Sequence, residues 1–390
     1  MSLLPKKERY VLMTGNDALC LGALKAGLKF YAAYPMTPAS SILHTMAASE
    51  HDYKIIVKHT EDEIAAINMV IGASIAGSRA MCGTSGGGFS LMVEGFGFGA
   101  IIETPFVVYV GTRAGPATGM PTWTGQGDFR FVMHASQDEF PRIILAPGDA
   151  AEAFQLAYRA FNMADRYQIP VIILSDTYLA DSLFTISVRD FEVRDPINRG
   201  AVIRIEDTDN VSEAKWNKPY KRYDPAAPNG ISPRAIPGVK GHIFLANSDE
   251  HDDYGYSEED AENRKKQMDK RMKKLDAIVK NNDAAAPNWY GRKKANKTIV
   301  CWGSTKGVAQ EALKHAKDVN VLHFNHLYPL NTKIVQKELN KIKRSVCIEG
   351  NYDGLLYSYL YEKTGYKCDE TFLKYDGRPF FVEEVIEKVQ

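Results

Sequence analysis

Residues 55–100 read IIVKHTEDEIAAINMVIGASIAGSRAMCGTSGGGFSLMVEGFGFGA, and this stretch decides the fold. A short apolar run is followed by three acidic residues and then by apolar residues at helical spacing as far as Gly77. The acids therefore fall in the first turn of a predicted helix, where the macrodipole favours carboxylates, and we expect this capping role for Glu61 and Asp62. Glu63 differs, because the small residues that follow it would let a ligand or another chain approach the helix backbone.

The predicted helix is followed by a strand and a glycine-rich loop. Residues 80–82 predict a short strand, and residues 84–88 (TSGGG) predict a tight loop. Such a loop exposes the backbone amides around Ser85, Gly86 and Gly87 to a ligand, although three consecutive glycines also fit an ordinary turn. The loop lies about twenty residues after Glu63, and this combination of a carboxylate with a glycine loop indicates a binding site.

Two prolines bracket a threonine in the segment YPMTPAS, residues 34–40. Residues that precede proline favour extended backbone, so this segment would hold Thr37 at the carboxyl end of a short buried strand predicted over residues 30–34. Parallel sheets place their ligand sites at that end. From its spacing alone, Thr37 would more simply cap the helix that begins near Ser40.

A buried strand is predicted over residues 104–111 (TPFVVYVG), and it is followed by Arg113 and a loop rich in glycine and proline that runs to Asp128. A long loop in a compact domain is commonly functional. A planar guanidinium can donate two parallel hydrogen bonds to a carboxylate, whereas a lone arginine after a strand more often faces solvent or phosphate. Both interpretations of Arg113 stay open on the pattern alone.

The chain resembles the alpha subunit of a 2-oxoacid:ferredoxin oxidoreductase, an enzyme that binds thiamine diphosphate. The resemblance is carried by three segments: residues 55–100, YPMTPAS at 34–40 and TRAGPATGMPT at 112–122. It is strong over residues 10–190 and moderate over 297–390. The chain departs from the family pattern in having Met36 and Ala39 where isoleucine and serine are usual.

The resemblance assigns roles to individual residues. The motif E-x-x-A-x-x-x-x-x-G, which ends at Gly72, places Glu63 against the aminopyrimidine ring of the cofactor. Thr37 would lie beside the thiazolium and hydrogen-bond the 2-oxoacid, and Arg113 would face the substrate carboxylate. The cofactor-binding set is completed by the residues of the glycine loop: Ser85, Gly86 and Gly87. The segment TGQGD, residues 124–128, resembles the family's loop over the active site.

The alternation of strands and helices predicts an α/β fold, with a parallel sheet covered by helices on both faces. The resemblance implies a pyrimidine-binding domain over residues 1–240, which ends in an irregular, proline-rich excursion, and a smaller transketolase C-terminal-like domain over 297–390. Residues 241–296 form a charged helical insertion and linker. The helix within residues 251–280 is amphipathic, and we expect its basic face to be solvated and to form acid–base pairs.

Two further local patterns carry predictions. Residues 16–28 predict a helix with Asn16 or Asp17 as its N-cap. The turn GSTKG at residues 303–307 resembles a phosphate-binding loop, but it lacks both the P-loop spacing and the G-x-G-x-x-G fingerprint. We therefore expect this turn to serve packing.

The composition argues against several classes of protein. At 390 residues, of which 45% are hydrophobic, the chain can bury sizeable cores in two or three domains. Lys plus Arg and Asp plus Glu both number 48, so no global basic field attracts nucleic acid or a membrane. No apolar run approaches the ~20 residues that cross a bilayer, and no signal-peptide core is evident, which predicts a cytoplasmic protein. Five scattered cysteines without a C-x-x-C pair predict no iron–sulfur cluster on this chain.

The resemblance implies coenzyme A-dependent oxidative decarboxylation of a 2-oxoacid to acyl-CoA and CO₂, with electrons passing to ferredoxin. No G-D-G motif followed by Asn stands at the spacing of a magnesium–diphosphate site. We therefore expect a beta subunit to supply Mg²⁺, the diphosphate-binding module and a [4Fe-4S] cluster, with gamma and ferredoxin-like delta subunits as further partners. Two alternatives stay open: the pyrimidine-side subunit of a lipoamide-linked 2-oxoacid dehydrogenase, and a non-catalytic assembly subunit.

Overall fold

The computed structural model describes residues 8–204 and 220–390. Within these residues the largest element is an eight-stranded sheet, whose strands run parallel apart from β15 and β6. Seven strands lie in this spatial order: β15 (His326–Tyr328), β7 (Ile143–Leu145), β8 (Pro170–Asp176), β5 (Phe106–Ala114), β4 (Ala80–Ser85), β2 (Phe30–Ala33) and β3 (Ile56–His59). The eighth strand, β6 (Met120–Thr124), pairs with β5.

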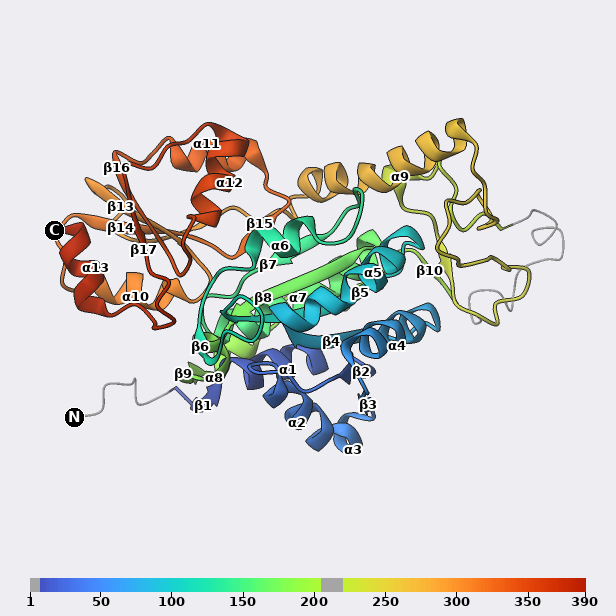
Figure 1. Cartoon of the computed structure of the whole chain (residues 1–390), viewed down its shortest axis with the longest axis horizontal. Helices are drawn as coiled ribbons and strands as arrows, with labels where there is room; N and C mark the ends of the chain where they lie inside the picture. The colour runs from blue at the N-terminus through green and yellow to red at the C-terminus, as the bar shows by residue number, and fades with distance from the viewer. Residues whose placement is uncertain (1–7, 205–219) are drawn as a thin grey trace.

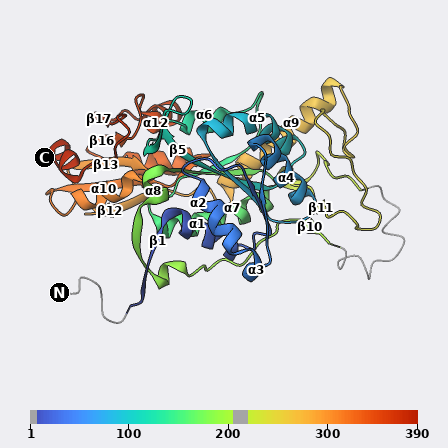
Figure 2. The same cartoon turned by 60° about the horizontal axis from the view of Figure 1, so that its bottom comes forward.

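Helices cover both faces of this sheet (Figure 1). One face carries α1 (Gly15–Lys25), α2 (Ser40–Ala48) and α7 (Ala150–Tyr167), and the other carries α4 (Glu63–Ile75), α5 (Gly86–Ile101) and α6 (Phe129–His134). In the turned view of Figure 2, α1, α2 and α7 lie below the sheet and α5 and α6 lie above it. The α/β fold class predicted from the sequence is confirmed.

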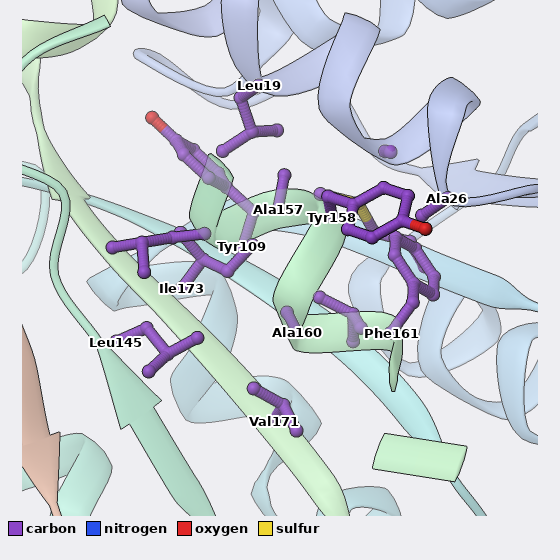
Figure 3. Close-up of a cluster of buried hydrophobic side chains, with 14 of the residues drawn as sticks. Leu19, Ala26, Tyr109, Leu145, Ala157, Tyr158, Ala160, Phe161, Val171 and Ile173 are labelled. Atoms are coloured by element: carbon purple, nitrogen blue, oxygen red, sulfur yellow. The ribbon is translucent and has the colours of Figure 1, made fainter. Parts of the chain in front are cut away.

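The core between α1, α7 and the sheet is apolar (Figure 3). Phe161 of α7 and Val171 of β8 are among its buried side chains, and burying each such residue stabilises the fold by about 1.5–3 kcal/mol. The two helices approach closely at Gly22, where a Cβ would lie 2.9 Å from the carbonyl carbon of Phe154. A larger residue at Gly22 would push α1 away from α7.

A second sheet, which we call the C-terminal unit together with its helices, has five strands. Their order is β12 (Asn288–Gly291), β14 (Val319–Phe324), β13 (Lys297–Trp302), β16 (Arg344–Glu349) and β17 (Glu370–Leu373), with β12 alone antiparallel. Its helices are α10 (Thr305–Ala312), α11 (Thr332–Leu339), α12 (Leu355–Thr364) and α13 (Val382–Val389). Figures 1 and 2 show this unit at one end of the molecule and the irregular residues around 220–260 at the other.

Two strands cross the predicted domain boundaries. β12 precedes residue 297 but pairs with β14 of the C-terminal unit. β15 lies after residue 297 but pairs with β7 of the large sheet. One buried apolar cluster also continues from the large sheet into the C-terminal unit, where it includes Trp302 and Tyr359. The two sheets therefore share a core, and the division at residues 240 and 296 stays a prediction.

Both predicted N-caps of the first helix are wrong. α1 begins at Gly15, and its N-cap is Thr14. Asp17 occupies the third helical position, where its carboxylate and the Thr14 hydroxyl satisfy each other's backbone amides in a capping box. Asn16 is turned inward and donates a hydrogen bond to the Pro38 carbonyl at 2.9 Å.

Two predicted loops are also more regular than expected. β4 continues to Ser85 and α5 begins directly at Gly86, so the glycines of residues 86–88 form the first turn of a helix. The segment after Arg113 turns back as β6, with Thr124 opposite Arg113 in the antiparallel register. This pairing satisfies backbone groups that an irregular loop would leave to water.

The remaining elements are short apart from α9: β1 (Tyr10–Thr14), α3 (Glu50–Tyr53), α8 (Thr177–Asp181), β9 (Leu183–Ser187), η1 (Val188–Phe191), β10 (Val202–Ile203), η4 (Pro228–Gly230), β11 (Arg234–Ala235) and α9 (Ala261–Lys280). Residues 205–219 of the predicted irregular excursion and residues 1–7 of the N-terminal segment lie outside the described residues. Among the described helices, none combines the length and the apolar character that crossing a bilayer requires.

The basic face of α9 is solvated only in part: Lys265, Lys266 and Lys273 are exposed as predicted, but two other lysines of the helix are buried. Lys270 and Lys274 are both 0% exposed, and each ammonium group lies 2.5 Å from a carboxylate oxygen of Glu103. Arg222, which is also buried, donates to the backbone carbonyl of Glu103 at 2.7 Å. The periodicity of α9 predicted the helix correctly, but it could not reveal that a carboxylate 167 residues earlier would draw two lysines into the interior.

The charges of this cluster depend on one another. Burial works to raise the pKa of the Glu103 carboxyl, but Lys270, Lys274 and Arg222 outweigh it and hold that pKa below its ordinary value. Burial lowers the pKa of the Lys274 ammonium to about 7, although the Glu103 carboxylate favours its charged form. Glu103 therefore stays ionised and compensates the buried cations.

Replacing Glu103 with Gln is expected to destabilise the protein by roughly 3–5 kcal/mol, because it leaves buried cations without their counter-charge. Chemical denaturation of the purified chain measures this loss. Glu311→Gln is the matched control, because Glu311 pairs with Lys314 on the surface and its loss should change stability little. Equal stability of the two variants would contradict the role of Glu103.

Candidate active site at the carboxyl ends of the parallel strands

The strand order of the large sheet creates a crevice at its carboxyl edge. β2 pairs with β3 on one side and with β4 on the other, so the chain reverses direction across the sheet at this point. Open parallel sheets bind ligands beyond the carboxyl ends of the strands at such a reversal. Thr37, Glu63, Ser85 and Arg113 follow or end β2, β3, β4 and β5, respectively, and therefore gather at this edge.

Glu63 is the first residue of α4 and is 3% exposed. The predicted capping role belongs to Asp62, whose side chain accepts a hydrogen bond from the Ala65 amide at 2.7 Å, while Glu61 is exposed ahead of the cap. Within the described chain, Glu63 Oε1 is buried without a hydrogen-bond partner. An unpaired buried carboxyl oxygen costs free energy, so this atom is suited to a donor from another molecule.

The first turn of α5 packs against that carboxyl group. A Cβ on Gly88 would lie 2.5 Å from Glu63 Oε1 and closer still to Thr84 Oγ1, so the position requires glycine. Ser85, the N-cap of α5, has a buried hydroxyl that also finds no partner among the described residues. The amides that open α5 have no acceptor inside the helix and carry the positive end of its dipole. This turn can therefore bind a polar or anionic group.

Thr37 and Arg113 are brought together by the structure. Arg113 Nη1 donates to the Thr37 carbonyl oxygen at 2.9 Å. Thr37 does not cap the next helix, since α2 begins after Ala39 and has no side-chain cap. The neighbouring Met36 links this pair to the Glu63 side of the site, because its sulfur accepts from the Thr84 hydroxyl at 3.9 Å.

Asp128 is a residue whose importance the sequence did not reveal. A Cβ on Gly86 would lie 2.9 Å from Asp128 Cγ, so the carboxyl group presses against the start of α5. Burial raises the pKa of Asp128 to about 6, although the nearby Arg113 guanidinium opposes the shift. The motif TGQGD was the available signal, but its loop character gave no reason to expect a partly buried carboxyl group facing Arg113.

An open recess lies beside these groups. Gly86, Gly87, Arg113 and Asp128 line it, together with the apolar side chain of Phe131. Glu63 and Thr37 do not line this recess, although Gly88 and Met36 connect them to it through the contacts above. Arg113 supplies the recess with a cation, so the recess can bind a carboxylate.

Metal ligands do not cluster in the part of the chain that the structure describes. Over residues 8–204 and 220–390, no group of three or more His, Cys, Asp or Glu side chains is placed to hold a metal ion. The five cysteines are all buried and unbridged.

Comparison with known families places the chain in a family of thiamine diphosphate-binding proteins. A family described as "Pyruvate flavodoxin/ferredoxin oxidoreductase, thiamine diP-bdg", that is thiamine diphosphate-binding, matches residues 21–270. The chain belongs to this family. The match includes every site residue discussed above, from Thr37 to Asp128.

Curated relatives agree with this assignment. The alpha subunit of 2-oxoacid:ferredoxin oxidoreductase 1 from Aeropyrum pernix is 36% identical over 403 residues, which cover 99% of this chain and 60% of the relative. The 2-oxoglutarate synthase subunit KorA from Methanocaldococcus jannaschii is 32% identical over 366 residues, which cover 93% of each. The chain spans about 60% of the length of the Aeropyrum subunit and of a similar subunit from Sulfurisphaera tokodaii.

A solved structure shares the whole fold. The 2-oxoglutarate:ferredoxin oxidoreductase from Magnetococcus marinus, solved with 2-oxoglutarate, coenzyme A and succinyl-CoA bound, superposes with a TM-score of 0.88 and 31% identity. The match covers 99% of this chain and 65% of that one, so it includes both sheets.

Asp128 is expected to make the folding stability of this chain depend on pH. Its pKa is raised in the folded state, so between about pH 4 and 6 the folded chain binds more protons than the unfolded chain, and stability falls as pH rises through this window. Asp128→Asn removes this dependence and should melt above the wild type at pH 7.5, with the difference shrinking towards pH 4. Thermal unfolding at several pH values measures it, and parallel pH profiles for the two proteins would contradict the shift.

Proposed function

We propose that this chain is the alpha subunit of a 2-oxoacid:ferredoxin oxidoreductase and supplies the pyrimidine side of a thiamine diphosphate site that a beta subunit completes. The observation that carries the proposal is the buried, unpaired Glu63 oxygen at the carboxyl edge of a parallel sheet in a member of this family. The relatives named as alpha subunits and as KorA support it.

The residues present fit this cofactor. Glu63 Oε1 can accept a hydrogen bond from the aminopyrimidine, and the Ser85 hydroxyl is a second buried group in need of a partner. Gly86 and Gly87 open α5 with amides that have no acceptor inside the helix, and Thr37 lies in the segment that follows β2. When bound, thiamine diphosphate supplies the electron sink for decarboxylation of a 2-oxoacid.

The chain's own groups then have distinct tasks. Glu63 holds a proton or a hydrogen bond at the pyrimidine in a site from which water is excluded. Arg113 binds the substrate carboxylate, and its hydrogen bond to the Thr37 carbonyl fixes the direction of the guanidinium. Asp128 sets the charge beside Arg113, because it is neutral below about pH 6 and negative above it.

The reaction as a whole requires partners. We propose a beta subunit that carries the diphosphate-binding module, Mg²⁺ and a [4Fe-4S] cluster, with gamma and delta subunits completing the assembly. The expected co-substrates are coenzyme A and ferredoxin, and the expected compartment is the cytoplasm. The name of the Magnetococcus enzyme, which binds 2-oxoglutarate and coenzyme A, supports a 2-oxoacid and a CoA thioester as substrate and product classes.

Glu63→Gln tests the proposal, since it keeps the size of the side chain and removes its acid–base function. In the complex reconstituted with its partner chains, exchange of the C2 proton of bound thiamine diphosphate should slow by roughly 10²–10⁴-fold, the range for a lost general acid–base group. NMR measures the exchange.

Glu61→Gln is the matched control, because Glu61 is an exposed acid two residues away and should leave the exchange rate unchanged. Equal exchange rates for the two variants would remove Glu63 from the mechanism and return it to a structural role at the start of α4.

A further inference from the structure

Gln126 is 2% exposed although it lies in the loop between β6 and α6. Its side-chain nitrogen donates to the Trp302 carbonyl at 3.0 Å, and its side-chain oxygen accepts from the Gly350 amide at 2.8 Å. Its own backbone amide donates to the Gly350 carbonyl at 2.7 Å. Asn351 adds a fourth bond by donating to the Gln126 carbonyl at 3.2 Å. All of these partners belong to the C-terminal unit, so Gln126 is one of the points at which the large sheet's loops are attached to that unit.

The place that Gln126 occupies is the second sheet's own crevice. β13 pairs with β14 on one side and β16 on the other, so the chain reverses direction between β13 and β16. Trp302 and Gly350 lie where these two strands end. A Cβ on Gly303 would lie 3.0 Å from Gln126 Nε2, and a Cβ on Gly350 would lie 3.3 Å from its Oε1. An open sheet ordinarily binds a ligand at this point, and here a side chain fills it.

Residues 303–307 resemble a phosphate-binding turn, and Ser304 and Thr305 of this turn line a pocket together with Gln126. The turn follows β13, and the Gln126 amide closes the space beside Gly303. The turn packs against a loop from the large sheet, and its packing role stays a prediction.

The same loop reaches the candidate active site through its two ends. Thr124, two residues before Gln126, stands opposite Arg113 in the β5–β6 pair and donates its backbone amide to Gly377 of the C-terminal unit at 2.9 Å. Asp128, two residues after Gln126, lines the recess with Arg113. Gln126 therefore lies in the middle of the loop 124–128, and it attaches this loop to the C-terminal unit. Both ends of the loop, Thr124 and Asp128, lie near Arg113.

We propose that Gln126 is a positioning residue: the C-terminal unit grips its side chain between β13 and β16 and thereby fixes the loop 124–128 over Arg113 and the oxoacid carboxylate. This inference rests on the proposed function. The C-terminal unit then contributes to the reaction without contacting the substrate, by holding the opposite wall of its recess.

The chain offers a matched control in Lys306. Its ammonium lies 2.5 Å from Asp149 and 2.8 Å from Glu152 at the start of α7, so it also joins the C-terminal unit to the large sheet through buried polar contacts. It makes no contact with the loop 124–128 among the hydrogen bonds and ion pairs that the structure describes. Lys306→Met weakens the junction between the sheets but leaves the loop attached.

The test uses the complex purified with its partner chains and follows 2-oxoacid-dependent reduction of ferredoxin. Gln126→Ala should lower kcat/KM for the oxoacid by about 10- to 100-fold, since misplacement of a binding wall by about 1 Å has effects of this size, and the KM for coenzyme A should stay unchanged. Gly350→Ala, which crowds Gln126 from the other side, should act in the same direction and less strongly. Lys306→Met should keep wild-type kcat/KM although its melting temperature falls.

The pH dependence of kcat/KM supplies a second readout, because a general loss of stability would not shift its limb near pH 6. Arg113 is the charged side chain that influences Asp128 in the described structure. When the loop is released, Asp128 becomes solvated, so the limb of the kcat/KM profile near pH 6 should move to lower pH in Gln126→Ala and stay in place in Lys306→Met.

The inference is overturned if Gln126→Ala keeps wild-type kcat/KM, or if Gln126→Ala and Lys306→Met lose it equally. Should Gln126→Ala fail to fold, Gly350→Ala decides alone, and a wild-type kcat/KM in that variant overturns the inference. A wild-type complex that oxidises no 2-oxoacid would refute the proposed function instead, so the two failures are distinguishable.

Discussion

A carboxyl oxygen buried without a hydrogen-bond partner is the feature around which this structure is arranged. Removing such a group from water costs roughly 1–3 kcal/mol or more when nothing compensates it. The chain keeps Glu63 in this position by letting Asp62 cap α4 and by placing Gly88 where any side chain would collide with the carboxylate. A capping role alone would not require either feature. The free-energy cost of the unpaired oxygen is offset when another molecule supplies the missing donor.

The two sheets use the same architectural opening in different ways. In the large sheet the crevice beyond β2 and β4 is bordered by groups that need partners, namely Glu63 and Ser85. In the C-terminal unit the equivalent crevice between β13 and β16 is filled by Gln126, whose amide is satisfied at both ends. On the proposed function, the first crevice receives the cofactor and the second receives the loop that faces the substrate. In this proposal the C-terminal unit contributes to the site by holding the loop 124–128 in place.

The sequence predicted the features that depend on local pattern. Apolar periodicity located α4, α7 and β8, and three short segments were enough to indicate the family and to bring Thr37, Glu63 and Arg113 to one edge. It failed where distant residues decide the local structure. The glycines at 86–88 read as a loop because glycine disfavours helices, yet they open α5. Distant residues explain two of these glycines, because Asp128 leaves no space for a side chain at position 86 and Glu63 leaves none at position 88.

The same limit explains why the sequence did not predict the buried lysines of α9 or the buried hydrogen bonds of Gln126. Lysines spaced along a helix normally predict a solvated face, and the buried Glu103 carboxylate reverses that expectation for Lys270 and Lys274. Gln126 stands between two glycines in what reads as a flexible loop, and its partners lie 176 and 224 residues later in the chain. The residue pattern within one segment carries no information about hydrogen bonds to distant segments. Such contacts are found only in the three-dimensional structure, where the two sheets lie together.

The most direct measurement of a cofactor site shared between two chains is calorimetry of thiamine diphosphate binding in the presence of Mg²⁺. The chain described here should bind the cofactor weakly by itself, because it offers groups for the pyrimidine while its described residues hold no cluster of metal ligands for the diphosphate. The complex with its partner chains should bind it tightly. Tight, magnesium-dependent binding by the isolated chain would contradict a site divided between subunits.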